Sequence, residues 1–143
     1  AKAMAIDDQN RLISILSALG NEQDDYFQKT FLSMGVGEKE HGEFKIDGKA
    51  TLLRDGAVKI AQTGSFLEIL TIMLAAEWMY LTWCERARDG HMTGPAKEWV
   101  ELHLSPDFRK QVSWLKNRVN ELGAKTPLDL QEVCAQHFKN MLD

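Results

Sequence analysis

One carboxylate in this sequence stands in surroundings where it could carry out proton chemistry. Glu77 is the only charged residue in the apolar stretch ILTIMLAAEWMYLTWC, residues 69–84. Tyr80 and Cys84 follow it three and seven residues later, so a helix would place the three side chains on one face. Burial without a cation nearby raises the pKa of a carboxyl and suits it to proton transfer near neutral pH. Glu77 is therefore our candidate catalytic residue.

Several residues around Glu77 could line a pocket for a flat heteroaromatic ligand. Trp78 and Tyr80 lie on the same predicted helix, and His103 could donate a hydrogen bond into the pocket. Cys84 could line the pocket, although a buried thiol is usually inert as a nucleophile. Each residue also has a simpler interpretation: most aromatic residues at helical spacing belong to the core, and a histidine at a helix end is often a surface residue. Glu77 itself could pair with an Arg or Lys of another helix, or face a subunit interface.

Other kinds of chemistry find no support in the motifs. The sequence contains no G-x-G-x-x-G, no phosphate-binding loop, no H-E-x-x-H and no nucleophile-elbow serine. Its four histidines are scattered, and no His/Glu pair at helical metal-ligand spacing stands out, which disfavours a di-iron bundle. We therefore expect no metal and no cofactor.

Composition and charge define the class of protein. The 143 residues fit one domain (residues 1–143), with 44% hydrophobic and 27% charged residues. A net charge of -4 argues against a nucleic-acid partner. The longest apolar stretch is shorter than the roughly 20 residues of a membrane span and contains Glu77, so we expect no membrane association. Neither cysteine lies in a C-x-x-C pair and no signal peptide is visible, which favours the cytoplasm. The expected partners are small molecules or further copies of the chain.

Hydrophobic periodicity predicts about seven helices and no strand, which makes the fold class all-α. Short connections between the helices indicate an up-and-down bundle. The central helix is apolar on nearly all sides, which predicts burial by several neighbours. The predicted helices cover about residues 2–19, 22–34, 50–62, 66–88, 96–103, 106–123 and 127–143.

Three helix starts carry local signals. Ser65 precedes the central helix with Glu68 three residues later, the pattern of a capping box. Ser105 stands before Pro106, which predicts an N-cap serine and a proline in the first turn. Thr126 stands before Pro127, and we predict the same start there, with Asp129 as the capping-box acid.

Two segments resemble the TenA family. Residues 75–83, AAEWMYLTW, resemble the family signature in which Cys is followed by x-W-x-Y. Residues 97–115, KEWVELHLSPDFRKQVSWL, resemble the family segment E-W-I-x-x-Y/H-x-S-x-E-F, and the spacing between the two blocks also fits. The resemblance is firm over residues 66–115, and a weaker match lies upstream in EQDDYF and SMGV.

The resemblance implies a fold, an activity and an assembly. The family has a haem-oxygenase-like helical bundle, usually assembled as a homo-oligomer, so we expect a dimer or tetramer. Its members hydrolyse aminopyrimidines from thiamin breakdown, and some cleave thiamin itself. Tyr80 matches the tyrosine of the signature, and His103 falls where many members have tyrosine. The implied partner is a pyrimidine substrate.

The departures from the family pattern refine this expectation. Ala76 stands where the best-known members have a catalytic Cys, which points to the branch without that Cys and directs attention to Glu77. Leu53 and Arg54 occupy the region where a pocket tyrosine is expected. The family's pocket Asp and late catalytic Glu would fall outside the 143 residues. The chain therefore resembles an incomplete bundle, lacking both ends, or else a degenerate member.

Our leading hypothesis is a hydrolase of aminopyrimidines or formylaminopyrimidines in thiamin salvage, with enzymatic activity expected of the full-length protein. The alternative is a non-catalytic, small-molecule-binding or regulatory protein on the same helical scaffold, because a fold does not fix a function. A third hypothesis is a helical interaction module without a ligand.

Overall fold

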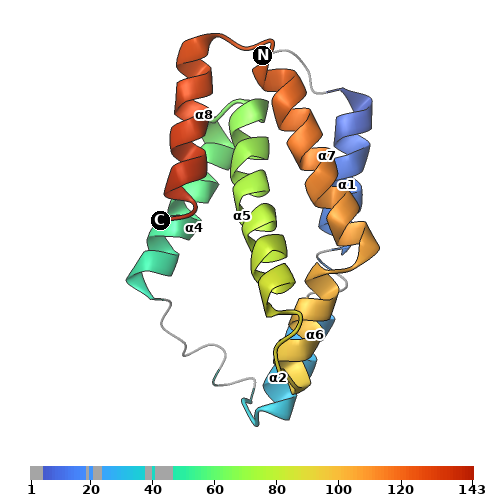
Figure 1. Ribbon diagram of the computed structural model, residues 1–143. Helices are drawn as coiled ribbons and strands as arrows, with labels where there is room; N and C mark the ends of the chain where they lie inside the picture. The colour runs from blue at the N-terminus through green and yellow to red at the C-terminus, as the bar shows by residue number, and fades with distance from the viewer. Residues whose placement is uncertain (1–4, 19, 21–23, 38–39, 41–46) are drawn as a thin grey trace. The chain divides into compact units, whose positions relative to one another are not determined.

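The structure, a computed structural model, describes residues 5–18, 20, 24–37, 40 and 47–143. These residues form seven helices and no strand, which confirms the predicted all-α class (Figure 1). The predicted helix boundaries agree with the structure to within a few residues wherever the residues are described. The helices are α1 (Ile6–Ala18), α2 (Asp24–Ser33), α4 (Gly48–Thr63), α5 (Phe66–Ala87), α6 (Gly94–His103), α7 (Pro106–Gly123) and α8 (Leu128–Asn140).

The chain divides into two compact units, residues 1–50 and residues 51–143. The first unit contains α1 and α2. Along α2, the rings of Phe27 and Phe31 stack with their centroids 6.2 Å apart, and Tyr26 contacts Phe27 edge-on at 5.4 Å. All the residues proposed from the sequence as a site lie in the second unit. The expectation of one domain over residues 1–143 stays a prediction.

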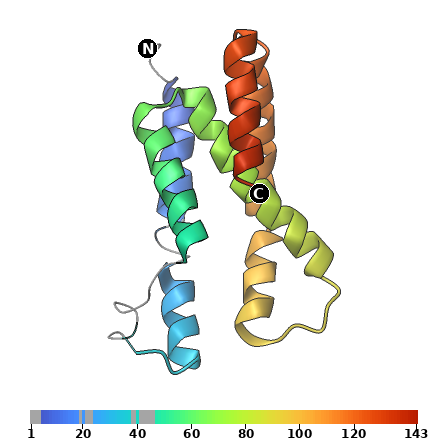
Figure 2. The ribbon, with the colours of Figure 1, turned by 90° about the vertical axis from the view of Figure 1, so that its left-hand side faces the viewer.

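Helix α5 is the centre of the second unit. It packs against α6, α7 and α8, and Figures 1 and 2 show α6 beside the C-terminal half of α5. Leu70, Leu74, Ala75 and Leu81 are among its buried side chains. Burying each of the three leucine side chains contributes about 1.5–3 kcal/mol, so the contacts of α5 hold this unit together.

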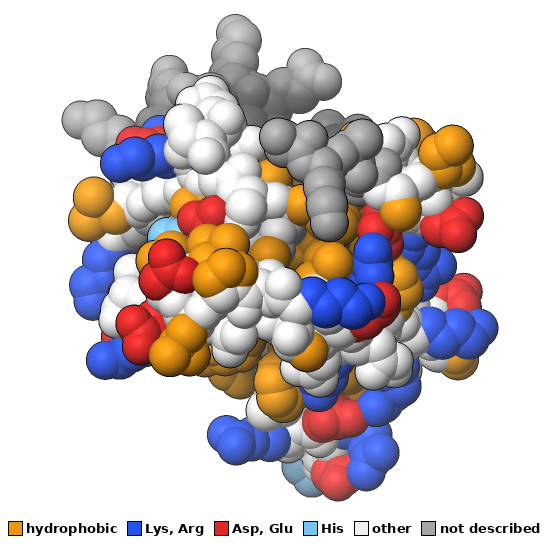
Figure 3. Space-filling model, turned by 90° about the horizontal axis from the view of Figure 1, so that it is seen from above, with side chains coloured by type: hydrophobic (Ala, Val, Ile, Leu, Met, Phe, Trp, Pro, Cys, Tyr) orange, Lys and Arg blue, Asp and Glu red, His pale blue; other side chains and the backbone are white. Residues whose placement is uncertain are grey.

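The prediction that α5 is buried on nearly all sides is wrong for one part of its surface. Trp78 and Trp83 are 41% and 55% exposed. Trp78 contacts Lys116 of α7 and Phe138 of α8 and is still partly exposed, because three neighbouring helices cover only part of a helix circumference. Hydrophobic side chains are also visible elsewhere at the molecular surface, between acidic and basic ones (Figure 3).

Among the described helices, α5 alone is long and apolar enough to cross a membrane. Length and composition do not distinguish such a segment from the central helix of a bundle. The packing of α6, α7 and α8 against α5 gives it the place of a central helix.

Two of the three predicted helix starts are confirmed. The Ser65 hydroxyl accepts a hydrogen bond from the Glu68 N–H, and a Glu68 carboxylate oxygen accepts one from the Ser65 N–H at 2.7 Å, which completes the capping box. At α7, the Ser105 hydroxyl accepts a hydrogen bond from the N–H of Phe108, and Pro106 occupies the first turn.

The third predicted start is wrong. Helix α8 begins at Leu128, with Pro127 as its N-cap residue and no side-chain cap. The Thr126 hydroxyl instead donates a hydrogen bond to the carbonyl of Leu122, four residues back at the end of α7. The threonine side chain therefore completes the preceding helix and is not available to cap the next one.

Candidate functional site

Glu77 lies in the third turn of α5 from its C-terminal end, and its side chain is partly buried. Burial raises the pKa of its carboxyl from 4.5 to about 7, as predicted for a shielded carboxylate. Among the described residues, none forms a hydrogen bond or ion pair with this carboxyl. The alternative of an ion pair with a neighbouring helix therefore finds no partner in the described part of the chain. A carboxyl with a pKa near 7 can both accept and return a proton at neutral pH.

Tyr80 joins an aromatic cluster between α5, α6 and α7. Its ring lies 5.7 Å from that of Trp99, edge-on, and 5.3 Å from the imidazole of His103. The His103 ring in turn contacts Trp99 at 4.0 Å and Phe108 at 4.8 Å. Two of the predicted site residues, Tyr80 and His103, thus lie together although they are 23 positions apart in the sequence.

His103 is held in one orientation and one tautomer. It is only 5% exposed, and its Nδ1 lies 2.8 Å from the backbone carbonyl of Trp99. Because a carbonyl only accepts hydrogen bonds, Nδ1 carries the proton and Nε2 is left with a lone pair. Burial lowers the pKa of the imidazole, and the hydrogen bond to Trp99 offsets part of that effect. His103 is therefore a neutral side chain at physiological pH.

Cys84 lies one turn beyond Tyr80 on α5 and is 2% exposed. Burial raises the pKa of its thiol, so the thiol stays protonated at neutral pH. A protonated thiol is a poor nucleophile. Cys84 can contribute to the wall beside Tyr80, and no described residue lowers the pKa of its thiol.

Trp78 lies away from the Tyr80 and His103 cluster. Two residues of helix rotate a side chain by about 200°, so Trp78 and Tyr80 project from opposite sides of α5. The indole of Trp78 contacts Phe138 of α8 edge-on at 6.2 Å, and the Lys116 ammonium of α7 lies 3.5 Å from its ring centroid. The structure does not bring Trp78 together with the other candidate residues, and its contact with substrate stays a prediction.

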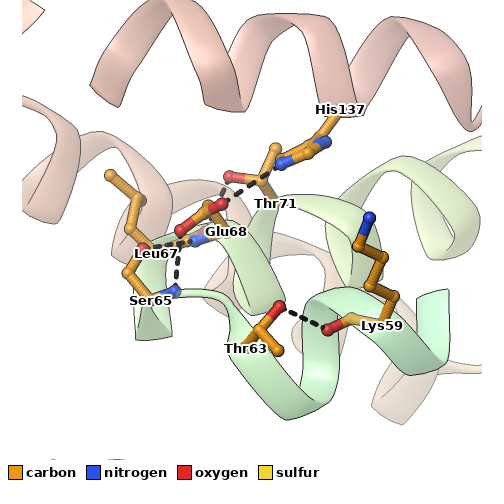
Figure 4. Close-up of polar contacts among 7 residues, drawn as sticks. All are labelled: Lys59, Thr63, Ser65, Leu67, Glu68, Thr71 and His137. Atoms are coloured by element: carbon orange, nitrogen blue, oxygen red, sulfur yellow. Dashed lines mark hydrogen bonds and ion pairs between the residues drawn. The ribbon is translucent and has the colours of Figure 1, made fainter. Parts of the chain in front are cut away.

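Sequence reasoning missed a polar contact between α5 and α8. Glu68, which we identified only as a capping residue, also lies 3.2 Å from Nε2 of His137 through its second carboxylate oxygen (Figure 4). Hydrogen bonds from the Ser65 backbone and side chain, followed by the contact with His137, lower the pKa of this carboxyl. Glu68 thus remains ionised and joins two helices.

The described residues contain no group of three or more His, Cys, Asp or Glu side chains that could hold a metal ion.

Comparison with known proteins identifies the class. A family model described as the TENA/THI-4/PQQC family matches residues 8–142, nearly the whole chain. The chain belongs to the TENA/THI-4/PQQC family, which has a helical, haem-oxygenase-like fold, and this confirms the predicted fold class. At the level of the family, membership supports a thiaminase II-like or related enzyme. A search of curated proteins found no match to the chain.

Proposed function

We propose that the protein hydrolyses a C–N bond of an aminopyrimidine or formylaminopyrimidine derived from thiamin, with Glu77 as the general base. The observation that carries this proposal is the Glu77 carboxyl, partly buried, with a pKa of about 7 and no hydrogen-bond or ion-pair partner among the described residues. Carboxylates of this kind concentrate at sites of proton transfer. Family membership supports the class of enzyme, and the resemblance of the α5 and α6 segments supports the pyrimidine substrate.

In the proposed reaction Glu77 first removes a proton from a water molecule. The water oxygen then bonds to the carbon that carries the leaving nitrogen. The C–N bond breaks, and its electron pair goes to the nitrogen, which takes the proton from the Glu77 carboxyl and leaves as an amine or ammonia. Glu77 ends as a carboxylate, as it began. A pKa near 7 favours both proton transfers. The carboxylate is basic enough to take the proton from water, and the carboxyl is acidic enough to give it to the leaving nitrogen.

The cluster around Tyr80 supplies the proposed binding surface. Tyr80 is three residues after Glu77, and side chains at this spacing on a helix are neighbours, about 5–6 Å apart at Cβ. The rings of Tyr80 and Trp99 offer apolar faces and edges to a flat heteroaromatic ring. The neutral His103, with its proton fixed on Nδ1, offers an acceptor at Nε2 for an amino group. Ala76, in place of the family Cys, contributes no nucleophile.

Release of ammonia or amine from thiamin-derived aminopyrimidines tests the proposal. The 143-residue chain and a version extended at both ends are each incubated with the pyrimidines, and products are followed by chromatography. The resemblance leads us to expect hydrolysis by the extended version. Activity of the shorter chain would show that the site is complete within it. Saturable binding of the pyrimidines without turnover by either version would favour the binding or regulatory alternative and overturn the proposed hydrolysis.

We also propose that the protein assembles as a homo-oligomer and is located in the cytoplasm. The resemblance suggests a homo-oligomer, and the cysteine usage suggests the cytoplasm. Light scattering of the purified protein tests the assembly directly.

A further inference from the structure

A hollow of about 440 Å³ opens between α5, α7 and α8. Helices α7 and α8 each pack on α5, so α5 forms the floor of the hollow and the other two helices form its walls. The hollow is separate from the Tyr80 cluster. Thr71, on the floor of the hollow, precedes Tyr80 by nine residues, which is two and a half turns of the helix. The two side chains therefore project from opposite sides of α5. Its lining residues are Leu67, Thr71, Val119, Asn120, Gly123, Ala124, Gln131, Cys134, Ala135 and Phe138.

Small residues on both walls explain why the space is open. Gly123 and Ala124 lie at the end of α7, and Ala135 faces them from α8. A Cβ atom built on Gly123 would meet nothing within 4 Å, and the residue does not have a positive φ. The chain therefore leaves room at a position where a larger side chain could be accommodated without strain.

Thr71 on the floor and Cys134 on the α8 wall are uncharged groups that are already paired. The Thr71 hydroxyl, 3% exposed, donates a hydrogen bond to the Leu67 carbonyl at 2.8 Å. The thiol of Cys134, 7% exposed, is hydrogen-bonded to Thr71. An occupant of the floor thus needs no polar group there, and an apolar body fits it best.

The rim offers two carboxamides and no charge. Gln131 donates its Nε2 hydrogen to the Thr126 carbonyl at 2.8 Å, which fixes the amide and leaves its oxygen as an acceptor. Asn120 stands on the opposite wall. No acidic or basic side chain is among the described residues that line the hollow. The ring of Phe138 also lines the hollow and contacts the indole of Trp78 edge-on at 6.2 Å.

We propose that this hollow binds a small, uncharged, planar ligand with a hydrogen-bonding edge. Its ring would lie on the apolar floor against Phe138, and its polar edge would reach the carboxamides of Asn120 and Gln131. The volume falls within the range of about 300–1,000 Å³ that small-molecule sites occupy. The absence of charge in the lining disfavours an ionised ligand, because a charge there would lose water without gaining a partner. The site is independent of the proposed hydrolysis.

Indole is a suitable probe, because it is planar, uncharged and carries one N–H donor. We expect saturable binding of indole by calorimetry, with changes in the NMR signals of the side-chain amides of Asn120 and Gln131. Gly123→Leu should weaken the binding by roughly tenfold or more, since the new side chain occupies the hollow. Asn117→Leu adds the same side chain on the exposed face of α7, outside the lining, and should leave the affinity unchanged.

Two further measurements keep the proposal falsifiable. If Gly123→Leu does not fold, Ala135→Leu fills the hollow from the other wall and should have the same effect. Indole-3-acetate, which has the same ring with a negative charge, should bind at least several-fold more weakly than indole. Absence of saturable indole binding, binding that neither Leu variant weakens, or tighter binding of indole-3-acetate would each overturn the proposal.

Discussion

Nε2 of His137 lies 3.2 Å from Oε1 of Glu68, and this contact joins α8 to the first turn of α5. The same carboxylate accepts the N–H of Ser65 through its other oxygen, so one side chain both caps α5 and holds α8 (Figure 4). Glu68 therefore links the start of the central helix α5 to α8, which packs on it.

Glu68 should make the stability of the protein depend on pH in acid. Its folded-state pKa is lowered below the ordinary 4.5, so its contribution is fully present above pH 4.5 and is lost as the pH falls through the lowered value. Glu68→Gln keeps an oxygen that can accept from Ser65 but removes the charge. We expect its melting temperature to lie below that of the parent protein near neutral pH, with the difference shrinking in acid.

Glu132→Gln is the matched control, because Glu132 is an exposed carboxylate on α8. It should follow the parent at every pH. A constant difference in melting temperature between Glu68→Gln and the parent down to the lowest pH would show that the charge of Glu68 contributes nothing.

Ser65→Ala should lower the free energy of unfolding by about 1 kcal/mol, the usual contribution of an N-cap residue.

Glu77 should have the opposite effect on stability. Its folded-state pKa, about 7, is above the ordinary 4.5, so between these values the folded chain holds a proton that the unfolded chain releases. Stability therefore falls as the pH rises through this window and stays lower above it. Glu77→Gln removes the titration and should stabilise the protein above pH 7 by on the order of 1–3 kcal/mol. Urea unfolding at several pH values measures this, and a variant less stable than the parent above pH 7 would contradict it.

Both cysteine thiols should be slow to react in the folded protein. Cys84 and Cys134 are 2% and 7% exposed, and burial raises the pKa of each thiol. With 5,5′-dithiobis(2-nitrobenzoic acid), two thiols should react rapidly in urea and slowly without it. Rapid modification of Cys84 in the folded state would restore it as a candidate nucleophile.

Lys116 and Trp78 should stabilise the fold together. The ammonium lies 3.5 Å from the ring centroid, and such cation–π contacts contribute about 0.5–1 kcal/mol at exposed sites. Lys116→Met should lose this amount and Lys116→Arg should keep most of it. A double-mutant cycle with Trp78→Leu checks the coupling, and fully additive losses would mean that the two side chains do not interact energetically.

Features set by neighbouring residues were predictable from the sequence. The capping box at Ser65 and the serine cap at Ser105 each depend on residues within three positions, and both are confirmed. The prediction failed at Thr126, which also precedes a proline. Its hydroxyl can form a hydrogen bond either with the start of the next helix or with the end of the preceding one. Its hydroxyl bonds to the helix behind it, and nothing in the local pattern favours one partner over the other.

The candidate site was predictable only along α5. The spacing of Glu77, Tyr80 and Cys84 places them on one face, and the cost of burying a carboxylate predicted the raised pKa of Glu77. The same helix geometry could have separated Trp78 from Tyr80. Contacts between distant segments, such as that of Tyr80 with His103, require the packing of α6 on α5, which a single sequence does not specify.

The pH dependence of hydrolysis with Glu77 and its glutamine variant is the most direct test of the central claim. In the version that turns over aminopyrimidine, kcat/KM should rise with pH through an apparent pKa near 7, as the carboxyl becomes the carboxylate base. Glu77→Gln should lower kcat at least a hundredfold while the protein stays folded, and the exposed control Glu132→Gln should match the parent. Unchanged turnover by Glu77→Gln, with the same pH profile as the parent, would contradict the assignment of Glu77 as the base.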